Sequence, residues 1–281
     1  MIRFIGNIKK MKLYRHPGRI YDDLKAAGYE DGAPLKVQDL IPFDQYHYLG
    51  TEAVDSAIEL LGINEKKHVI EIGSGIGGPA RYIAAKTQCH VTAIEMQPDL
   101  NDIAEALTVR CALSKLVRHI SADILEFDGS AGTFDAIVSW LAFLHISDRK
   151  ALFEKCRGLL KSGGKIFIED FCRKSALNRE DEAILFEDTA CSYLPAIGEY
   201  KKHLAQAGFY SIRVTDMSKK WASFVRGRQE KFNLNMSRYA DIHGKEVADE
   251  MGDFYNKMAC IFTRGNVGGV RIFAQREGGE K

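Results

Sequence analysis

A glycine-rich segment directly after a short apolar run is the strongest constraint on the fold of this chain. The run His68–Ile72 suits a buried central strand, and Gly73–Gly78 contributes four glycines straight after it. Pro79–Lys86 is then predicted as a helix with proline in its first turn, where a missing N–H is tolerated. A strand that ends in closely spaced glycines and leads into a helix lets a ligand approach the backbone. The segment therefore predicts an α/β fold with a ligand at a strand end.

Helical and strand periodicity alternate through residues 51–171, which is typical of a parallel sheet with helices on its faces. Further strands are predicted at His90–Glu95, Arg118–Ala122, Phe134–Trp140 and, after the turn Lys161–Gly164, at Lys165–Asp170. Helices are predicted at Glu52–Leu61, Asp99–Cys111 and Asp148–Leu160. The later part is less regular, with helices at Asn178–Tyr193 and Gly198–Ala207, strands at Ser211–Asp216 and Val270–Gln275, and a helical insert at Trp221–Arg264.

The composition narrows the class of protein and of partner. With 281 residues, 46% of them hydrophobic, the chain can form one large domain or one domain with a sizeable cap. No apolar run approaches the roughly 20 residues that a membrane span needs, so no stable membrane insertion is expected. The 39 basic and 38 acidic side chains leave a net charge of +1, which argues against nucleic-acid binding. We therefore expect a small-molecule partner.

Cysteine and histidine spacing gives no sign of a metal site. The six cysteines are scattered without a CxxC pair, and the eight histidines form no HxxxH or HExxH pair. Reduced thiols in a cytoplasmic protein are the expected state.

The amino end is basic. Residues 1–19 contain no acid, and their basic residues are Arg3, Lys9, Lys10, Lys12, Arg15 and Arg19. The segment lacks serine and no signal-type apolar region follows it, which disfavours a targeting peptide. A basic arm or lid helix is the prediction.

Three acids distinguish two classes of ligand for the glycine loop. Gly73, Gly75 and Gly78 satisfy the GxGxxG pattern of dinucleotide sites, whose acid lies about 20 residues further on, where Glu95 stands. Glu71, however, precedes the first glycine, where a carboxylate would repel a pyrophosphate and attract an ammonium group. S-adenosylmethionine has that ammonium group. Glu95 can accept both ribose hydroxyls, and Asp123 can accept from the adenine amine.

The stretch from Asp44 to Phe171, which contains these three acids, resembles the class I S-adenosylmethionine-dependent methyltransferases. The resemblance is to the small-molecule branch that includes sarcosine/dimethylglycine and phosphoethanolamine N-methyltransferases, with sterol methyltransferases more distant. The matching segments are Asp44–His47, Glu71–Arg81, Val91–Glu95, Phe134–Ile137 and Leu159–Gly164.

The resemblance implies a Rossmann-like seven-stranded sheet with an antiparallel last strand and helices on both faces. It also implies an N-terminal arm and lid (1–50), a cofactor-binding core (51–175) and a remainder (176–281) whose helical insert, about 221–264, caps the substrate. The cofactor-binding residues that it implies are Gln45, Tyr46, Glu71, Gly73, Ser74, Gly75, Glu95, Met96, Asp123, Ile124, Ser139 and Trp140.

The implied chemistry is methyl transfer from S-adenosylmethionine. The activated methyl group leaves the protein to align the reactants, exclude water and, for an amine or hydroxyl acceptor, remove a proton. His145 has a pKa range suited to that removal. Phosphoethanolamine methyltransferases carry a catalytic tyrosine and histidine pair, which matches Tyr46 and His145.

The acceptor is less well defined. Phe171, Ala190 and Ser192 stand where phosphoethanolamine enzymes have a tyrosine and the phosphate-binding arginine and tyrosine, so that acceptor is not expected. The sterol branch's aromatic signature ahead of the glycine loop is missing as well. Glu169 and Asp170 would favour a cationic amine if they face the pocket. Aromatic side chains of the later part would either form its core or line that pocket, namely Tyr193, Tyr200, Trp221 and Phe224.

N-methylation of a small amine is the leading prediction. The alternatives are C- or O-methylation of a larger apolar acceptor, sterol-like or phenolic, an NAD-dependent oxidoreductase, and a cofactor-binding scaffold without activity. A monomer or a homodimer is expected.

Overall fold

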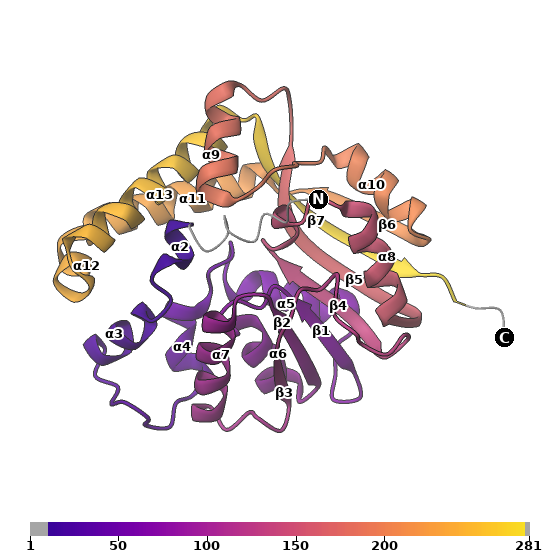
Figure 1. The fold of residues 1–281 in the computed structure, drawn as a ribbon, viewed down its shortest axis with the longest axis horizontal. Coiled ribbons are helices and arrows are strands. Elements are labelled where there is room, and N and C mark those ends of the chain that lie inside the picture. Colours follow the sequence, from indigo (N-terminus) through magenta and orange to yellow (C-terminus); the bar gives the residue numbers. More distant parts are fainter. Residues whose placement is uncertain (1–10, 279–281) are drawn as a thin grey trace.

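The structure is a computed structural model that describes residues 11–278. Its centre is a seven-stranded sheet with strand order β3-β2-β1-β4-β5-β7-β6 (Figure 1). The strands are β1 (His68–Ile72), β2 (His90–Glu95), β3 (Val117–Ser121), β4 (Phe134–Trp140), β5 (Leu160–Arg173), β6 (Phe209–Asp216) and β7 (Val267–Arg276). Strands β1 to β5 pair in parallel, and β7 runs antiparallel to both β5 and β6. The predicted seven-stranded sheet with an antiparallel last strand is confirmed.

Helices lie on both faces of this sheet and beyond its edge (Figure 1). They are α2 (Lys12–Arg15), α3 (Arg19–Ala26), α4 (Val37–Asp44), α5 (Thr51–Leu61), α6 (Gly78–Thr87), α7 (Pro98–Arg110), the 3-10 helix η1 (Phe143–His145), α8 (Arg149–Leu159), α9 (Arg179–Thr189), α10 (Ile197–Gln206), α11 (Ser218–Leu234), α12 (Met236–His243) and α13 (Lys245–Arg264). Local signals fix several ends. Gly62 ends α5 in the left-handed conformation, and the Asp148 side chain accepts from the Ala151 N–H to begin α8.

Alternate side chains of the strands enter two apolar layers, as the pleat of a sheet requires. In β1, Val69 packs into a layer that contains Ala80 of α6, whereas Ile70 packs into a layer with Phe153 of α8 and Leu204 of α10. The sheet is therefore covered on both faces by apolar contacts.

The largest differences from the predicted boundaries are at β5 and α9, while β6 and β7 begin two and three residues before the predicted Ser211 and Val270. The predicted turn at residues 161–164 lies within β5, because Leu160 already pairs with Phe134 before the register shifts. The predicted helix from Asn178 ends at Thr189 rather than Tyr193, because Ala190 takes a left-handed conformation with φ 48°.

The helical insert comprises α11, α12 and α13 and begins at Ser218. Trp221 is fully buried and packs edge-on to Tyr48 and at a tilt to Phe262, with ring centroids 4.9 and 6.2 Å away. Much of the insert's aromatic content is therefore core. None of the helices described within residues 11–278 is both long and apolar enough to cross a membrane.

The basic arm lies against this insert. Helix α2 contacts α13, and α3 contacts α12, although these pairs are far apart in the sequence (Figure 1). Arg3, Lys9 and Lys10 of the predicted arm lie outside the described residues.

Candidate active site

Two adjoining cavities lie at the carboxyl ends of the parallel strands. The larger one, of about 350 Å³, lies beside β1, β2 and β3, and its wall includes Glu95, Met96, Asp123 and Ile124. The smaller one, of about 70 Å³, lies between the end of β1, the arm and the insert. Their walls have five residues in common, which are Tyr14, Gly73, Gly75, Leu141 and His145. The cavities therefore meet at the glycine loop, where open α/β sheets bind ligands.

Glycine is required where the cavities meet. Gly73 has φ +73°, and a Cβ built on it would lie 2.2 Å from the Cβ of Ala142. Side chains larger than hydrogen are excluded there by both conformation and space.

Two backbone N–H groups hold the Glu95 carboxylate in place at the wall of the larger cavity. Its Oε2 accepts from the Gly75 N–H at 2.8 Å, and its Oε1 accepts from the Gln97 N–H at 2.9 Å. Burial raises the pKa of Glu95, and these N–H groups act in the opposite direction. Each oxygen retains a lone pair for a ligand hydroxyl. The Asp123 side chain accepts from the Leu125 N–H at 2.9 Å, which orients it at the wall of the same cavity.

Glu71 is a buried carboxylate with an unused oxygen. Its side chain lines the smaller cavity, the residue is 2% exposed, and Oε2 has no partner among the described residues. Burial raises the pKa of Glu71 well above its usual value, while Arg81 and a backbone hydrogen bond from Ala80 lower it. A cationic ligand group would supply the missing partner.

Arg81 of α6 positions the segment that covers the glycine loop. Its Nη2 lies 3.0 Å from Asp44 Oδ2, and its Nη1 donates to the carbonyl of Ala104 at 3.2 Å. Gly78 permits this contact, because a Cβ there would lie 2.3 Å from the Asp44 carbonyl oxygen. Neither Asp44 nor Arg81 was among the predicted site residues, although both lie in the motifs that carried the resemblance.

His145 lines both cavities, and Tyr46 lines the smaller one. Burial lowers the pKa of His145 to about 4, so the imidazole is neutral near pH 7. Its Nδ1 has no partner among the described residues. Tyr14 was not predicted. Its ring meets that of His145 edge-on at 6.5 Å, and it lines both cavities.

The remaining predicted residues divide between the cavities and the structure around them. Ser74 and Trp140 line the smaller cavity. Gln45 and Ser139 line neither; Gln45 Nε2 donates to Asp44 Oδ1, and Ser139 Oγ donates to the Ile72 carbonyl, each at 2.8 Å.

Two acids considered for the pocket face other partners. Glu169 accepts from Arg271 at 2.6 Å, and Asp170 accepts from the Tyr200 hydroxyl at 3.2 Å. Neither lines the two cavities, and the same holds for Tyr193, Trp221 and Phe224. The insert instead contributes Arg228, Phe254 and Met258 to the smaller cavity.

Comparison with known proteins identifies the central part of this chain. Residues 69–164 match the family described as methyltransferase domain. A phosphoethanolamine N-methyltransferase of Zea mays is 28% identical over 72% of this chain and 40% of its own length. The corresponding protein of Plasmodium falciparum is 25% identical over 74% of this chain and 78% of its own length. The chain thus spans about 40% of the plant relatives that it matches.

A solved structure gives the same fold. Phosphoethanolamine N-methyltransferase 2 of Haemonchus contortus, in complex with phosphomonomethylethanolamine and S-adenosylhomocysteine, matches 99% of this chain and 61% of its own, with a TM-score of 0.81 at 17% identity. Residues 69–164 are therefore a methyltransferase domain, within a chain that has the Rossmann-like fold of the class I methyltransferases.

Proposed function

We propose that this protein is an S-adenosylmethionine-dependent methyltransferase that methylates the nitrogen of a small amine. The observation that carries the proposal is the meeting of the two cavities at Gly73 and Gly75. A nucleoside cofactor in the larger cavity would present its reactive end where the smaller cavity begins. The relatives from Zea mays and Plasmodium falciparum cited above are named as N-methyltransferases, which supports nitrogen as the acceptor atom.

The residues present fit this cofactor. Glu71, with its unpartnered buried oxygen, would bind the ammonium group. Glu95 would accept from the ribose hydroxyls and Asp123 from the adenine amine, while Ile124 would pack on the adenine ring. When bound, the cofactor supplies a methyl group already activated by a positive sulfur.

The side chains around the shared wall would handle the acceptor's proton. A neutral imidazole can accept a proton, so the lowered pKa of His145 keeps it in the basic form. We assign His145 as the base and Tyr46 as its partner in the smaller cavity. Tyr14, edge-on to His145, is the additional hydroxyl that the geometry brings to this wall.

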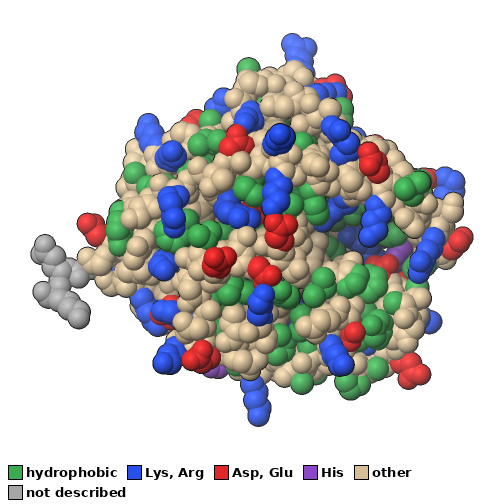
Figure 2. Space-filling model, turned by 180° about the vertical axis from the view of Figure 1, so that it is seen from behind, with side chains coloured by type: hydrophobic (Ala, Val, Ile, Leu, Met, Phe, Trp, Pro, Cys, Tyr) green, Lys and Arg blue, Asp and Glu red, His purple; other side chains and the backbone are tan. Residues whose placement is uncertain are grey.

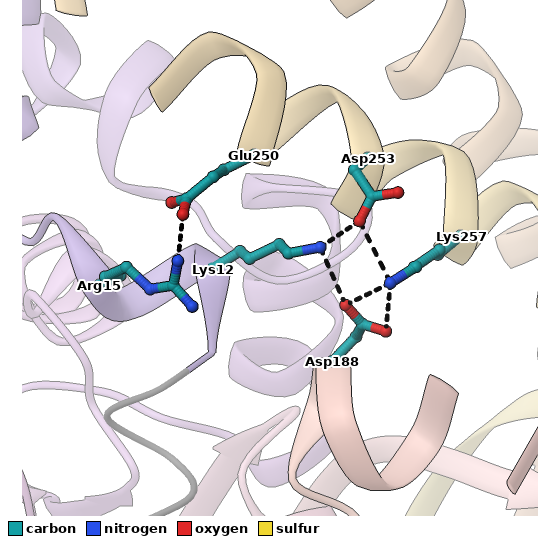
Figure 3. Close-up of polar contacts among 6 residues, drawn as sticks. All are labelled: Lys12, Arg15, Asp188, Glu250, Asp253 and Lys257. Carbon is teal, nitrogen blue, oxygen red and sulfur yellow. Dashed lines mark hydrogen bonds and ion pairs between the residues drawn. The ribbon is translucent and has the colours of Figure 1, made fainter. Parts of the chain in front are cut away.

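Residues 1–50 would form the lid, residues 51–175 the cofactor-binding core and residues 176–281 the remainder of the sheet with its cap. Helix α2 supports the lid assignment because one of its sides lines the cavities and the other contacts α13 and α9. Leu13 and Tyr14 line the cavities, whereas Lys12 and Arg15 face α13 and α9 (Figure 3).

Ion pairs hold the side of α2 that faces α13 and α9. Lys12 pairs with Asp253 and lies 3.4 Å from Asp188, which Lys257 also contacts at 2.9 Å. Arg15 pairs with Glu250 (Figure 3). Ion pairs thus join α2 to α13 and α9.

C- or O-methylation of a larger apolar acceptor is the second candidate, because aromatic side chains such as Phe171 and Phe254 line the smaller cavity. An oxidoreductase is disfavoured by Glu71, whose carboxylate would repel a pyrophosphate at the glycine loop. Figure 2 shows basic and acidic side chains interspersed on one face, which supports a small-molecule partner rather than nucleic acid. We propose a cytoplasmic monomer or homodimer.

The test of the cofactor assignment is calorimetric titration with S-adenosylhomocysteine and, separately, with NAD. The proposal requires binding of the first and not the second. Glu95→Gln should weaken S-adenosylhomocysteine by about 1 kcal/mol or more, because it replaces a charged acceptor. Glu105→Gln, on the outer surface of α7, is the matched control and should leave the affinity unchanged.

A further inference from the structure

The charged groups around the smaller cavity are unsuited to a phosphate. Among the described residues, its wall has two carboxylates, Asp44 and Glu71, and a single guanidinium, Arg228. Two histidines, His47 and His145, complete the titratable groups apart from tyrosines. A phosphate monoester carries nearly two negative charges near pH 7 and is bound by cations that donate charge-assisted hydrogen bonds.

Arg228 is already committed to the protein. Its Nη1 donates to the carbonyl of Tyr46 at 3.2 Å, and its Nη2 donates to the carbonyl of His47 at 2.8 Å. Its guanidinium also lies over the rings of Tyr48 and Phe224, at 5.6 and 4.7 Å from their centroids. A turn toward an anion would break both hydrogen bonds and release the segment that covers the glycine loop.

The histidines supply no compensating charge. His47 Nε2 lies 3.0 Å from the Gly50 carbonyl oxygen, which can only accept, so Nε2 carries a proton. Burial lowers the pKa of both His47 and His145 to about 4. Near pH 7 neither histidine therefore adds a positive charge to the wall, and its one guanidinium, Arg228, is held by backbone carbonyls.

The other walls of the cavity are apolar and aromatic. Phe171 stacks on Tyr48 with ring centroids 5.9 Å apart, and Leu144, Phe254 and Met258 complete this side. The unpartnered polar atoms of the wall include the Trp140 indole N–H and the Ser74 hydroxyl, both uncharged. These groups suit an amine with an uncharged body.

We propose that the methyl acceptor is a small amine whose remaining part is apolar and bears no phosphate. The inference rests on the proposed N-methylation and goes further, since it separates this site from the phosphoethanolamine specificity in the names of its relatives. Phe171 and Phe254 are the residues that would select the apolar body.

The test compares acceptors that share an aminoethyl end. Phenethylamine, ethanolamine and phosphoethanolamine are each assayed for release of S-adenosylhomocysteine, and each is titrated into the protein–S-adenosylhomocysteine complex. We expect kcat/KM for phenethylamine to exceed that for phosphoethanolamine by about 100-fold, as expected where an unpaired charge must be buried. A kcat/KM for phosphoethanolamine equal to or above that for phenethylamine overturns the inference.

The titrations with the three amines separate this inference from the proposed N-methylation. If no amine is methylated, the N-methylation fails, but tighter binding of phenethylamine than of phosphoethanolamine still supports the apolar class. Binding of phosphoethanolamine alone, or of none of the three, overturns it.

A pair of variants locates the effect in the smaller cavity. Phe254→Leu should weaken phenethylamine by about 5-fold and leave S-adenosylhomocysteine affinity unchanged, because a smaller side chain leaves part of the apolar body uncovered. Phe186→Leu, at a half-exposed position on α9, makes the same change outside both cavities and should change neither. Equal effects of the two variants on phenethylamine contradict the assignment.

Discussion

Arg81 and Asp44 form an ion pair in which neither side chain is exposed, with Nη2 and Oδ2 3.0 Å apart. The pair joins α6, which begins at the glycine loop, to the end of α4. It therefore fixes the segment that contains Gln45 and Tyr46 over the candidate site.

Removal of one partner should affect stability and cofactor binding together. Asp44→Asn leaves a buried guanidinium without its counter-charge, which costs about 3 to 5 kcal/mol in comparable pairs. We expect that loss in urea unfolding, and weaker S-adenosylhomocysteine binding by calorimetry. Asp55→Asn removes the exposed pair with Lys86, also on α6, and should cost less than about 1 kcal/mol. Similar losses in both variants would show that the Asp44 pair has no special position.

His145→Gln should separate catalysis from binding. The imidazole lines the wall common to both cavities, so its loss as a base should lower kcat by roughly 100-fold or more. The affinity for S-adenosylhomocysteine should stay within about 2-fold, because Glu71, Glu95 and Asp123 remain. Steady-state kinetics and calorimetry on the same preparation measure both quantities. Full turnover in the variant would remove His145 from the mechanism.

His119, which is not one of the proposed catalytic groups, should make the folding stability depend on pH. Burial lowers its pKa from 6.5 to about 4, so between these values the unfolded chain binds more protons than the native one. Its contribution to stability is therefore lost as the pH falls through that window. His119→Gln should become more stable relative to the unmodified protein as the pH is lowered, measured by urea unfolding. A stability difference that does not change with pH would mean that His119 titrates normally.

The ion pairs of α2 should control how fast ligands leave. Exposed pairs contribute up to about 1 kcal/mol each, so Lys12→Met with Arg15→Met should accelerate S-adenosylhomocysteine release by about 10-fold. Stopped-flow fluorescence measures that rate. Concentrated salt should accelerate release from the unmodified protein and have little effect on the double variant.

Lys220→Met is the control for the arm, because it removes a pair between α11 and Glu52 of α5. Its release rate should match that of the unmodified protein. If it does not, the ion pairs act on general stability and not through the arm.

The central sheet could be predicted from sequence because its strands are short apolar runs between turn residues. His68–Ile72, His90–Glu95 and Phe134–Trp140 agree with the structure at both ends. The start of β5 could not be predicted, because the glycines of Lys161–Gly164 indicate a turn, whereas the pairing of Leu160 with Phe134 begins the strand earlier.

Some residues of the candidate site could likewise be predicted from the sequence, and others could not. Glu71 and Glu95 lie at the carboxyl ends of β1 and β2, and Asp123 follows β3, so parallel pairing brings them to one edge of the sheet. Tyr14 could not be placed, because its position depends on ion pairs between α2 and residues more than 170 positions away, such as Lys12 with Asp188. Arg228 could not be placed either, because it reaches the site through hydrogen bonds to the backbone of residues 46 and 47.

Mass spectrometry of one reaction mixture tests the central claim most directly. The protein is incubated with S-adenosylmethionine and a panel of small amines, and S-adenosylhomocysteine and methylated amine are quantified together. The account predicts equal amounts of the two products, with the added methyl group on nitrogen. Binding of S-adenosylhomocysteine without methylation of any amine, or methylation confined to carbon or oxygen acceptors, would contradict it.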